Sequence, residues 1–400
     1  MKIANVVYGL DGGGAGIAVN RINKVLNSQK KISKIITYQD LKINNKYYFF
    51  IKKNFQIFVN KLLKKFLFYF FNLKFTNTIN FNIFSSALLK QINESNFNII
   101  NLHWLGNDTL SIQDVGKIHK KTIITLHDMW PYTSVEHYTD NNYFKKYYSI
   151  KSKYKRNFIL NYIFNLKIKN FKNISHLICT SEWQKNMANN SLVFKNTKKT
   201  IIPLPLNFTL WKQIKKKDAK KKISINDNIF TIFLPLADRF AAKRKGLNLI
   251  IQTLEKLNDI KICLVTTNYD NINFKNKFIK HKNYNNINSR KKLIELYSAS
   301  DLFAMPSVYE SFGQTLLEAQ ACNCPAIVFE NTGCADLVSH KINGYKAKYL
   351  DLNDFKNGIL WSIKNKNKKS FSFIRNNAKK RFSEKIIFHK YKKFYDSINL

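Results

Sequence analysis

The sequence predicts an α/β protein of two domains, each built on a mostly parallel sheet. Short apolar runs alternate with polar or helical stretches, which is the pattern of strands joined by helical crossovers. The alternation occurs twice, and a polar, basic stretch without an apolar period separates the two series at residues 212–228. Ligands bind beyond the carboxyl ends of the strands in such sheets, so two facing domains are expected to share a central cleft.

The first series covers residues 1–207. Apolar runs that are followed by polar or helical stretches mark the expected strands, at residues 3–8, 32–38, 98–102, 122–126 and 177–180. A helix is expected at residues 17–26, after the first strand. Residues 201–207 predict the end of a further strand and the linker to the second domain.

The second series follows this linker. Its expected strands lie at residues 229–236, 261–266, 302–305 and 326–329. Its expected helices lie at residues 247–257, 290–298 and 314–321. The length of the chain fits two or three domains of ordinary size.

The chain carries a large excess of positive charge. It has 67 lysines and arginines against 25 aspartates and glutamates, which gives a net charge of +42. Such a surface favours anionic partners such as nucleotides, phospholipid or nucleic acid. The abundance of Lys, Asn, Ile and Phe is also what translation from an AT-rich genome produces, so both explanations stay open.

Cysteine usage and hydropathy indicate the compartment. The five cysteines fit no paired framework, which favours a reduced, cytoplasmic setting and structural roles. The first expected strand begins directly after Met1 and Lys2, so no signal peptide is expected. The longest charge-free aromatic run, at residues 66–73, is far shorter than the about 20 residues that cross a bilayer.

Two glutamates form the most informative motif. Glu310 follows the strand expected at residues 302–305, and Glu318 lies inside the next helix, with Gly313 where that helix would begin. A helix rises about 1.5 Å per residue, so their separation spans roughly 12 Å, about the length of a nucleotide diphospho-sugar. One carboxylate would reach the sugar and the other the ribose, with the diphosphate near the helix N-terminus.

Each glutamate also has a structural alternative. In the structural alternative, Glu310 caps the helix that follows it, because the helix dipole favours a negative charge at that end. Glu318 is then a surface residue with lysines nearby. The motif alone leaves both alternatives open.

A basic turn follows the strand expected at residues 229–236. Arg239 and Lys245 bracket this turn, and Lys243 and Arg244 lie between them. Cations at a strand end beside a helix N-terminus suit a diphosphate leaving group. Composition does not choose among the four cations, and a solvated basic turn is the alternative.

Histidines end two neighbouring strands of the first series. His127 and Asp128 end the strand at residues 122–126, where such a pair can face a cleft and handle a proton or a hydroxyl, although a lone histidine is more often structural. His103 ends the preceding strand and is expected to line the same cleft. The other six have no such context and are expected on the surface or in the core: His119, His137, His176, His281, His340 and His389.

A glycine loop joins the first strand to the first helix. Five of the twelve glycines lie at residues 9–16, in the strand–loop–helix context of a loop that contacts phosphate or sugar. The spacing is neither that of the dinucleotide-binding fingerprint nor that of a Walker loop. A plain tight turn is the alternative.

The stretch from Tyr47 to Phe75 mixes aromatic side chains with lysines. On a helical wheel Lys61, Lys64 and Lys65 share one side and apolar residues another. This favours either a basic amphipathic helix on an anionic membrane surface or a helix packed on the N-terminal sheet. Aromatics among lysines also permit binding of single-stranded nucleic acid, but no recognised nucleic-acid module appears, so no such partner is expected.

Five motifs, in order along most of the chain, together resemble the retaining glycosyltransferases of family GT4, and among them bacterial enzymes that build capsular, O-antigen or colanic-acid-type polysaccharide. The motifs are GGGAG at residues 12–16, LHDMWP at 126–131, TSEW at 180–183, RFAAKRKG at 239–246 and ESFGQTLLEAQACNCP at 310–325. The last motif is fairly specific, and the ordered series is a stronger signal than any single motif.

The resemblance implies the GT-B fold, in which two Rossmann-like domains face a central cleft. Residues 1–207 would be the acceptor-side domain and residues 208–380 the domain that binds the nucleotide sugar. Residues 381–400 would form a helix that packs back on the N-terminal domain.

The resemblance also assigns roles to matching residues. Glu310 would contact the donor sugar near the reacting centre, and His127 would lie beside that sugar as the second catalytic candidate. Glu318 would bind the ribose, while Arg239 and Lys245, in preference to the two cations between them, would neutralise the diphosphate. Further donor contacts are expected from Phe312, Gly313, Gly13 and Gly14, and acceptor-side contacts from Gly16, Asp128 and Trp130.

The implied function is the transfer of a sugar, with retention, from a UDP- or GDP-sugar to a lipid-linked oligosaccharide or other glycan acceptor in surface polysaccharide synthesis. No metal or other cofactor is expected, and the chain lacks an Asp-x-Asp site. The expected location is the cytoplasm, at the inner face of the bacterial inner membrane. The alternatives are a GT-B nucleotide-sugar epimerase and a non-enzymatic basic protein that binds membrane or nucleic acid.

One departure from the family pattern carries a structural expectation. The chain has Cys-Asn-Cys-Pro at residues 322–325 where relatives carry Cys-Gly-Thr-Pro. Asparagine adopts the left-handed backbone conformation more readily than most residues, so Asn323 is expected to preserve the turn.

Overall fold

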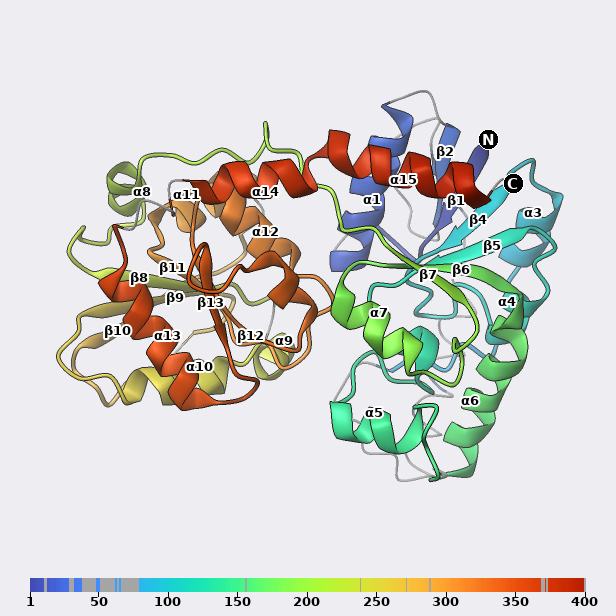
Figure 1. Cartoon of the computed structure of the whole chain (residues 1–400), viewed down its shortest axis with the longest axis horizontal. Helices are drawn as coiled ribbons and strands as arrows, with labels where there is room; N and C mark the ends of the chain where they lie inside the picture. Colours follow the sequence, from blue (N-terminus) through green and yellow to red (C-terminus); the bar gives the residue numbers. More distant parts are fainter. Residues whose placement is uncertain are drawn as a thin grey trace. The chain divides into compact units, whose positions relative to one another are not determined.

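The chain folds into two units (Figure 1). The computed structural model describes residues 1–10, 13–28, 32–37, 48–50, 62, 65, 79–154, 157–237, 239–270, 272–287, 289–367, 371 and 373–398, with the backbone alone at residues 32, 48–50, 239 and 240. The first unit comprises Met1–Pro205 and Ile387–Leu400, and the second comprises Leu206–Ile386. The second unit is therefore inserted into the chain of the first.

The first unit is built on a parallel sheet. Within the described residues its seven strands have the order β3-β2-β1-β4-β5-β6-β7. The three central strands β1, β4 and β5 are direct neighbours, so the residues that follow them meet at one edge of the sheet. The strands are β1 (Lys2–Val6), β2 (Ile32–Thr37), β3 (Tyr48–Phe50), β4 (Ile99–Leu102), β5 (Lys121–Thr125), β6 (Ile174–Cys179) and β7 (Lys198–Ile201).

Helices connect these strands, and side chains cap several of them. Ser111 begins α4 with a capping box, in which its hydroxyl accepts the Asp114 N–H and the Asp114 carboxylate accepts the Ser111 N–H. The helices are α1 (Gly14–Asn27), α3 (Leu88–Glu94), α4 (Ile112–Gly116), α5 (Asn141–Tyr147), α6 (Phe158–Asn170), α7 (Glu182–Asn189) and α15 (Glu384–Ile398), with 3-10 turns η1 (Trp130–Tyr132) and η2 (Phe171–Asn173).

The second unit repeats the parallel design. Its six strands, counted over the described part of the chain, have the order β10-β9-β8-β11-β12-β13. Strands β8 and β11 are neighbours, so the loops that follow them meet. The strands are β8 (Phe230–Leu234), β9 (Ile262–Thr267), β10 (Ile279–Tyr284), β11 (Leu302–Met305), β12 (Ala326–Phe329) and β13 (Gly344–Ala347).

Helices cover both faces of this second sheet. Figure 1 shows α10 and α13 along one face and α11, α12 and α14 along the other. The helices are α8 (Lys216–Lys222), α9 (Arg239–Arg244), α10 (Leu247–Glu255), α11 (Arg290–Ala299), α12 (Gln314–Ala321), α13 (Leu352–Lys364) and α14 (Ile374–Phe382), with a 3-10 turn η3 (Gly333–Leu337).

Burial explains which strands the sequence predicts. Every residue of β4, β8, β9, β11 and β12 is buried, as expected of parallel strands with helices on both faces, so these strands are mostly apolar in sequence. The predicted strand at residues 302–305 and the predicted helix at residues 314–321 match β11 and α12. Strands β10 and β13 are not in the prediction; β10 lies at the sheet edge, and its sequence alternates lysines with other polar residues.

The stretch from Tyr47 to Phe75 begins differently from its prediction. Residues Tyr48–Phe50 are strand β3, which pairs with β2, so the helix predicted for the whole stretch is wrong at this end. Leu62 and Lys65 are helical and exposed. The remainder of the predicted membrane helix lies outside the described residues, and docking on a membrane stays a prediction.

Three smaller expectations concern turns, thiols and membrane spans. Asn323 has φ of 62°, so the expected left-handed turn at Cys-Asn-Cys-Pro is confirmed. The five cysteines are buried and free, as expected of structural residues. Over the part of the chain that the structure describes, each helix is too short or too polar to cross a membrane.

Candidate functional site

A carboxylate and two cations meet at the carboxyl edge of the second sheet. Glu310 follows β11, and Lys245 follows α9, the helix after β8. Nζ of Lys245 lies 2.6 Å from Oε2 of Glu310, and Nη1 of Arg244 lies 3.8 Å from the same oxygen. The Lys245 and Glu310 side chains are 16% and 15% exposed, so the pair is largely shielded from water but reachable.

Burial and the neighbouring charges act in opposite directions on the pKa of Glu310. Burial raises the pKa of the Glu310 carboxyl, but the charges of Lys245 and Arg244, the Lys245 hydrogen bond and the Phe312 N–H together hold that pKa below its ordinary value. Glu310 is therefore ionised at neutral pH. The alternative of an acidic helix cap is wrong, because the N-cap of α12 is Gly313 and the Glu310 carboxylate pairs with cations.

Backbone contacts hold the two loops together. The Val308 N–H donates to the Arg244 carbonyl at 2.9 Å, and the Arg244 guanidinium donates to the Tyr309 carbonyl at 3.1 Å. Gly246 has φ of 75°, and a Cβ there would lie 1.9 Å from the Pro306 carbonyl oxygen. Only glycine allows this approach, so Gly246 fixes the distance between the loops that carry Lys245 and Glu310.

The second glutamate lies inside α12. Glu318 is 7% exposed, and Oε2 accepts a hydrogen bond from the Tyr297 hydroxyl at 3.2 Å. The alternative of a solvated surface glutamate is therefore wrong. Gly313 begins the helix with φ of 94°, and Phe312 beside it is buried, with its ring 6.0 Å from that of Phe382.

The cations of the basic turn have different positions. Lys245 and Arg244 reach Glu310, whereas Lys243 is exposed. The side chain of Arg239 lies outside the described residues, so its predicted role stays a prediction. Arg244 is the functional candidate that the family resemblance sets aside; its contact with the Tyr309 carbonyl is not visible in the sequence.

The glycine loop of the first unit divides into two kinds of glycine. A Cβ at Gly16 would lie 2.6 Å from the Gly9 carbonyl oxygen, so Gly16 allows the loop to pack on α1. A Cβ at Gly13 would meet no atom within 4 Å, and both Gly13 and Gly14 are exposed. The tight packing explains Gly16, and the predicted donor contacts of Gly13 and Gly14 stay predictions.

Two histidines meet at the carboxyl edge of the first sheet. Nε2 of His127 lies 2.9 Å from Nδ1 of His103, which confirms that the ends of β4 and β5 bring them together. Burial, opposed by the charge of Asp128, lowers the pKa of His127 to about 4. Burial and the neighbouring His127 likewise lower the pKa of His103, so both imidazoles are neutral at neutral pH.

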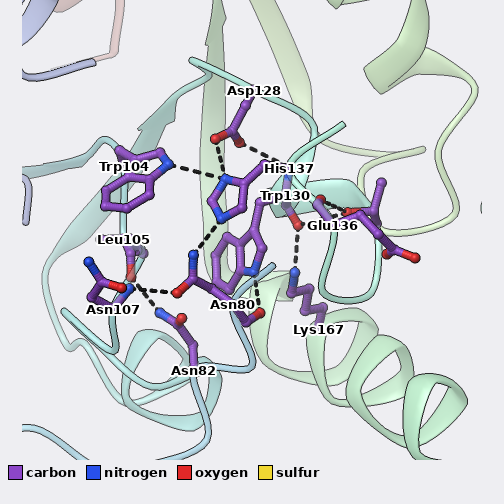
Figure 2. A network of polar contacts seen from close by, with 11 residues as sticks. Asn80, Asn82, Trp104, Leu105, Asn107, Asp128, Trp130, Glu136, His137 and Lys167 are labelled. Carbon is purple, nitrogen blue, oxygen red and sulfur yellow. Dashed lines mark hydrogen bonds and ion pairs between the residues drawn. The ribbon is translucent and has the colours of Figure 1, made fainter. Parts of the chain in front are cut away.

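A buried network holds the loop that carries His127 (Figure 2). Nδ1 of His137 lies 2.5 Å from Oδ2 of Asp128, and Nε2 lies 2.6 Å from Nδ2 of Asn80. Oδ1 of Asn80 accepts the Asn107 N–H at 2.8 Å, so its amide nitrogen faces His137 as the donor. The Trp104 indole also donates to Nδ1 of His137 at 3.1 Å, so His137 joins Asp128, Asn80 and Trp104 in one network.

Trp130 and Lys167 complete this network. The Trp130 indole donates to the Asn80 carbonyl at 2.7 Å, and the Trp130 N–H donates to Oδ1 of Asp128 at 3.0 Å. Nζ of Lys167 lies 3.5 Å from the centre of the Trp130 ring and donates to the Trp130 carbonyl. Asp128 and Trp130 thus position the loop after β5, and their predicted contact with an acceptor stays a prediction.

The two edges support different chemistry. The second unit offers cations and a carboxylate, which suit a diphosphate and a developing positive charge on a sugar. The first unit offers neutral histidines, which suit hydrogen bonds with hydroxyl groups. In the described ranges, no group of three or more His, Cys, Asp or Glu side chains is placed to hold a metal ion.

Comparisons with known proteins match the second unit to a family of enzymes. The family model described as "Glycosyl transferases group 1" matches residues 215–381, which lie in the second unit. An N,N'-diacetylbacillosaminyl-diphospho-undecaprenol alpha-1,3-N-acetylgalactosaminyltransferase of Campylobacter jejuni is 30% identical over 106 residues, which are 26% of this chain and 28% of that protein.

A second curated relative matches a longer stretch. A UDP-Gal:alpha-D-GlcNAc-diphosphoundecaprenol alpha-1,3-galactosyltransferase of Escherichia coli is 26% identical over 215 residues, which are 49% of this chain and 53% of that protein. The matches thus span about a quarter and about half of these relatives' lengths.

The fold has close counterparts among solved structures. The sucrose-phosphate synthase of Thermosynechococcus elongatus superposes with a TM-score of 0.71, over 100% of this chain and 99% of that chain, at 15% identity. At this identity the likeness concerns the fold alone.

Proposed function

We propose a reaction for this chain on the premise that it is a glycosyltransferase: residues 215–381 belong to the group 1 glycosyl transferases, and the two units have the GT-B fold. The predicted enzyme class and fold are thereby confirmed. The reaction is the transfer of a sugar from a nucleotide-diphosphate sugar to a lipid-linked saccharide during synthesis of a surface polysaccharide.

The contact between Lys245 and Glu310 carries this proposal. A cation 2.6 Å from a carboxylate, with Arg244 beside it, places both charge types of the reaction within one loop cluster. When the bond between sugar and diphosphate breaks, negative charge grows on the diphosphate and positive charge on the sugar ring. Lys245 and Arg244 stabilise the first, and Glu310 positions the sugar and supports the second.

The remaining donor contacts follow from position on the same unit. Glu318 lies in α12, where its carboxylate accepts the ribose hydroxyls of the donor as it accepts the Tyr297 hydroxyl. Gly313 begins that helix, whose N-terminal N–H groups face the diphosphate. Lysine and arginine supply the positive charge, so the reaction proceeds without a metal.

The relatives' names guide the acceptor and the stereochemistry. Both describe transfer to a saccharide on diphospho-undecaprenol with an alpha-1,3 linkage. We assign this chain an acceptor of the same chemical class, bound by the first unit at the inner face of the membrane. An α-linkage formed from an α-linked nucleotide sugar is a reaction with retention.

A panel of nucleotide sugars tests the donor site. Lys245→Ala should weaken binding of UDP or GDP at least tenfold, because a charge-assisted phosphate contact is worth roughly 1.5–3 kcal/mol. Isothermal titration with UDP-, GDP- and ADP-sugars measures this loss and identifies the base. Lys243→Ala, which changes an exposed neighbouring lysine, is the matched control and should bind as the unaltered protein does.

Two results would overturn the proposal. Equal nucleotide affinity of Lys245→Ala and Lys243→Ala would show that the ion pair is structural. Isomerised donor in a reaction without acceptor would instead identify a nucleotide-sugar epimerase.

A further inference from the structure

A chain of buried polar side chains runs across the first sheet and ends at His127. Asn5 on β1 is fully buried, and Nε2 of His103, after β4, lies 3.0 Å from Oδ1 of Asn5. Nδ1 of His103 lies 2.9 Å from Nε2 of His127, after β5. The three residues belong to neighbouring strands, so the sheet itself sets their spacing.

Asn5 sets the direction of every hydrogen bond in this chain. Its amide nitrogen donates to the Ser33 hydroxyl at 2.7 Å, and its Oδ1 accepts from Nδ2 of Asn101 at 3.1 Å. Oδ1 therefore faces His103 as an acceptor, and His103 donates from Nε2. A neutral imidazole carries one proton, so Nδ1 of His103 is an acceptor and Nε2 of His127 must be the donor.

We propose that Asn5 and His103 are positioning residues that hold His127 with its proton on Nε2, so that its bare Nδ1 accepts a hydrogen bond from a substrate hydroxyl. Among the residues that the structure describes, none hydrogen-bonds to Nδ1 of His127. Asp128, the adjacent carboxylate, is engaged by His137 and the Trp130 N–H.

This arrangement defines the substrate group. A hydroxyl can donate to Nδ1, whereas the diphosphate of a nucleotide sugar or a carboxylate has no proton to give at neutral pH. The burial that keeps both imidazoles neutral also disfavours an imidazolium that would attract an anion. The identity of the hydroxyl as part of a sugar rests on the proposed function, but the tautomer of His127 does not.

Nitrogen NMR of the unaltered protein tests the tautomer directly. In a long-range ¹H–¹⁵N correlation spectrum at neutral pH, His127 should show a protonated Nε2 and a bare Nδ1, and His103 the same pattern. The chain has 8 histidines, so His127→Gln and His103→Gln spectra assign the signals by loss. A proton on Nδ1 of His127 would overturn the proposal.

Paired substitutions test the consequence for turnover. His103→Leu removes the acceptor for the Nε2–H of His127. Because the free energy of one hydrogen bond corresponds to about a tenfold change in rate, kcat should fall about tenfold, while KM for the donor stays unchanged. His103→Gln should restore kcat, because one amide both accepts from His127 and donates to Asn5. His119→Leu changes an exposed histidine and is the control that should match the unaltered protein.

The outcomes separate this inference from the proposed function. Loss of kcat in His103→Gln as deep as in His103→Leu would overturn the positioning role, because packing alone would then explain both. Failure of every donor in the panel would refute the proposed function, while the NMR spectrum, which needs no substrate, would still decide the tautomer.

Discussion

Lys245 and Glu310 form a contact that any anionic ligand must share. Lys245 already pairs with the Glu310 carboxylate at 2.6 Å. A singly charged anion that replaces this carboxylate as the partner of Lys245 therefore gains little free energy. A diphosphate bridges more than one cation and also reaches Arg244, which lies 3.8 Å from the same carboxylate oxygen. In the proposed donor site, this ion pair should therefore favour a diphosphate over a single phosphate.

The lowered pKa of His127 predicts the pH dependence of the reaction. His127 is neutral above a pKa of about 4, compared with an ordinary value of 6.5, because burial outweighs the opposing charge of Asp128. In the range from about pH 6 to 8, kcat/KM should show no histidine inflection, and it should fall as His127 is protonated near pH 4. An inflection near pH 6.5 that disappears in His127→Gln would contradict this prediction.

The same shift acts on stability with a definite sign. Between pH 6.5 and about 4 the unfolded chain binds a proton at His127 that the folded chain excludes. This contribution to the free energy of unfolding is complete above pH 6.5 and is lost as the pH falls through the folded pKa.

Residue types were predictable from the sequence, but their partners were not. The loop positions of Glu310 and Lys245 follow from the strands before them, which are mostly apolar and therefore visible in the sequence. The role of Arg244 depends on the Tyr309 carbonyl, and the place of His137 in the core depends on Asn80 and Asp128. These partners come from distant parts of the chain, and no spacing in the sequence reveals them.

At the scale of the element, Gly246 allows the loop before α10 to pack closely against Pro306, directly after β11. Gly246→Ala should destabilise the second unit by about 2–4 kcal/mol, because the backbone has φ of 75° and the new Cβ would lie 1.9 Å from the Pro306 carbonyl oxygen. Amide hydrogen exchange of α10 and β11 measures the loss.

Gly13→Ala is the matched control. Its Cβ would meet no atom within 4 Å, and its backbone is extended, so stability should stay the same within about 0.5 kcal/mol. Equal protection in the Gly246→Ala and Gly13→Ala proteins would show that the close approach to Pro306 relaxes at little cost.

Elements were predictable where burial is uniform. The buried strands and α12 follow from apolar runs, but the edge strand β10 has the sequence Ile-Lys-His-Lys-Asn-Tyr and is mostly half-buried. Strand β3 is an edge strand of the first sheet. It lies within a stretch whose aromatic and lysine residues fit a helical wheel. Pairing with a neighbouring strand, which is a tertiary contact, decides these cases.

At the scale of the whole molecule, the last residues of the chain belong to the first unit. Tyr391 and Tyr395 on α15 are fully buried, and the Phe394 ring lies 5.7 Å from that of His176 on β6. Tyr391→Ala should therefore destabilise the first unit by about 3–5 kcal/mol. Hydrogen exchange should show lost protection in β5 and β6, with the second unit unaffected.

An exposed neighbour on the same helix gives the control. His389→Ala should leave protection in both units as it is, because the His389 side chain is exposed. Loss of protection in the second unit alone, after Tyr391→Ala, would contradict the assignment of residues 387–400 to the first unit.

The insertion of the second unit sets an order for folding during synthesis. The ribosome finishes Leu206–Ile386 before it makes the final segment Ile387–Leu400, which completes the first unit. Translation proceeds at about 5–20 residues per second, so roughly 10 to 40 seconds pass between the synthesis of the first 205 residues and that of α15. The nascent chain thus exposes the apolar surface that α15 later covers, and a chaperone that binds apolar segments would protect it during this interval.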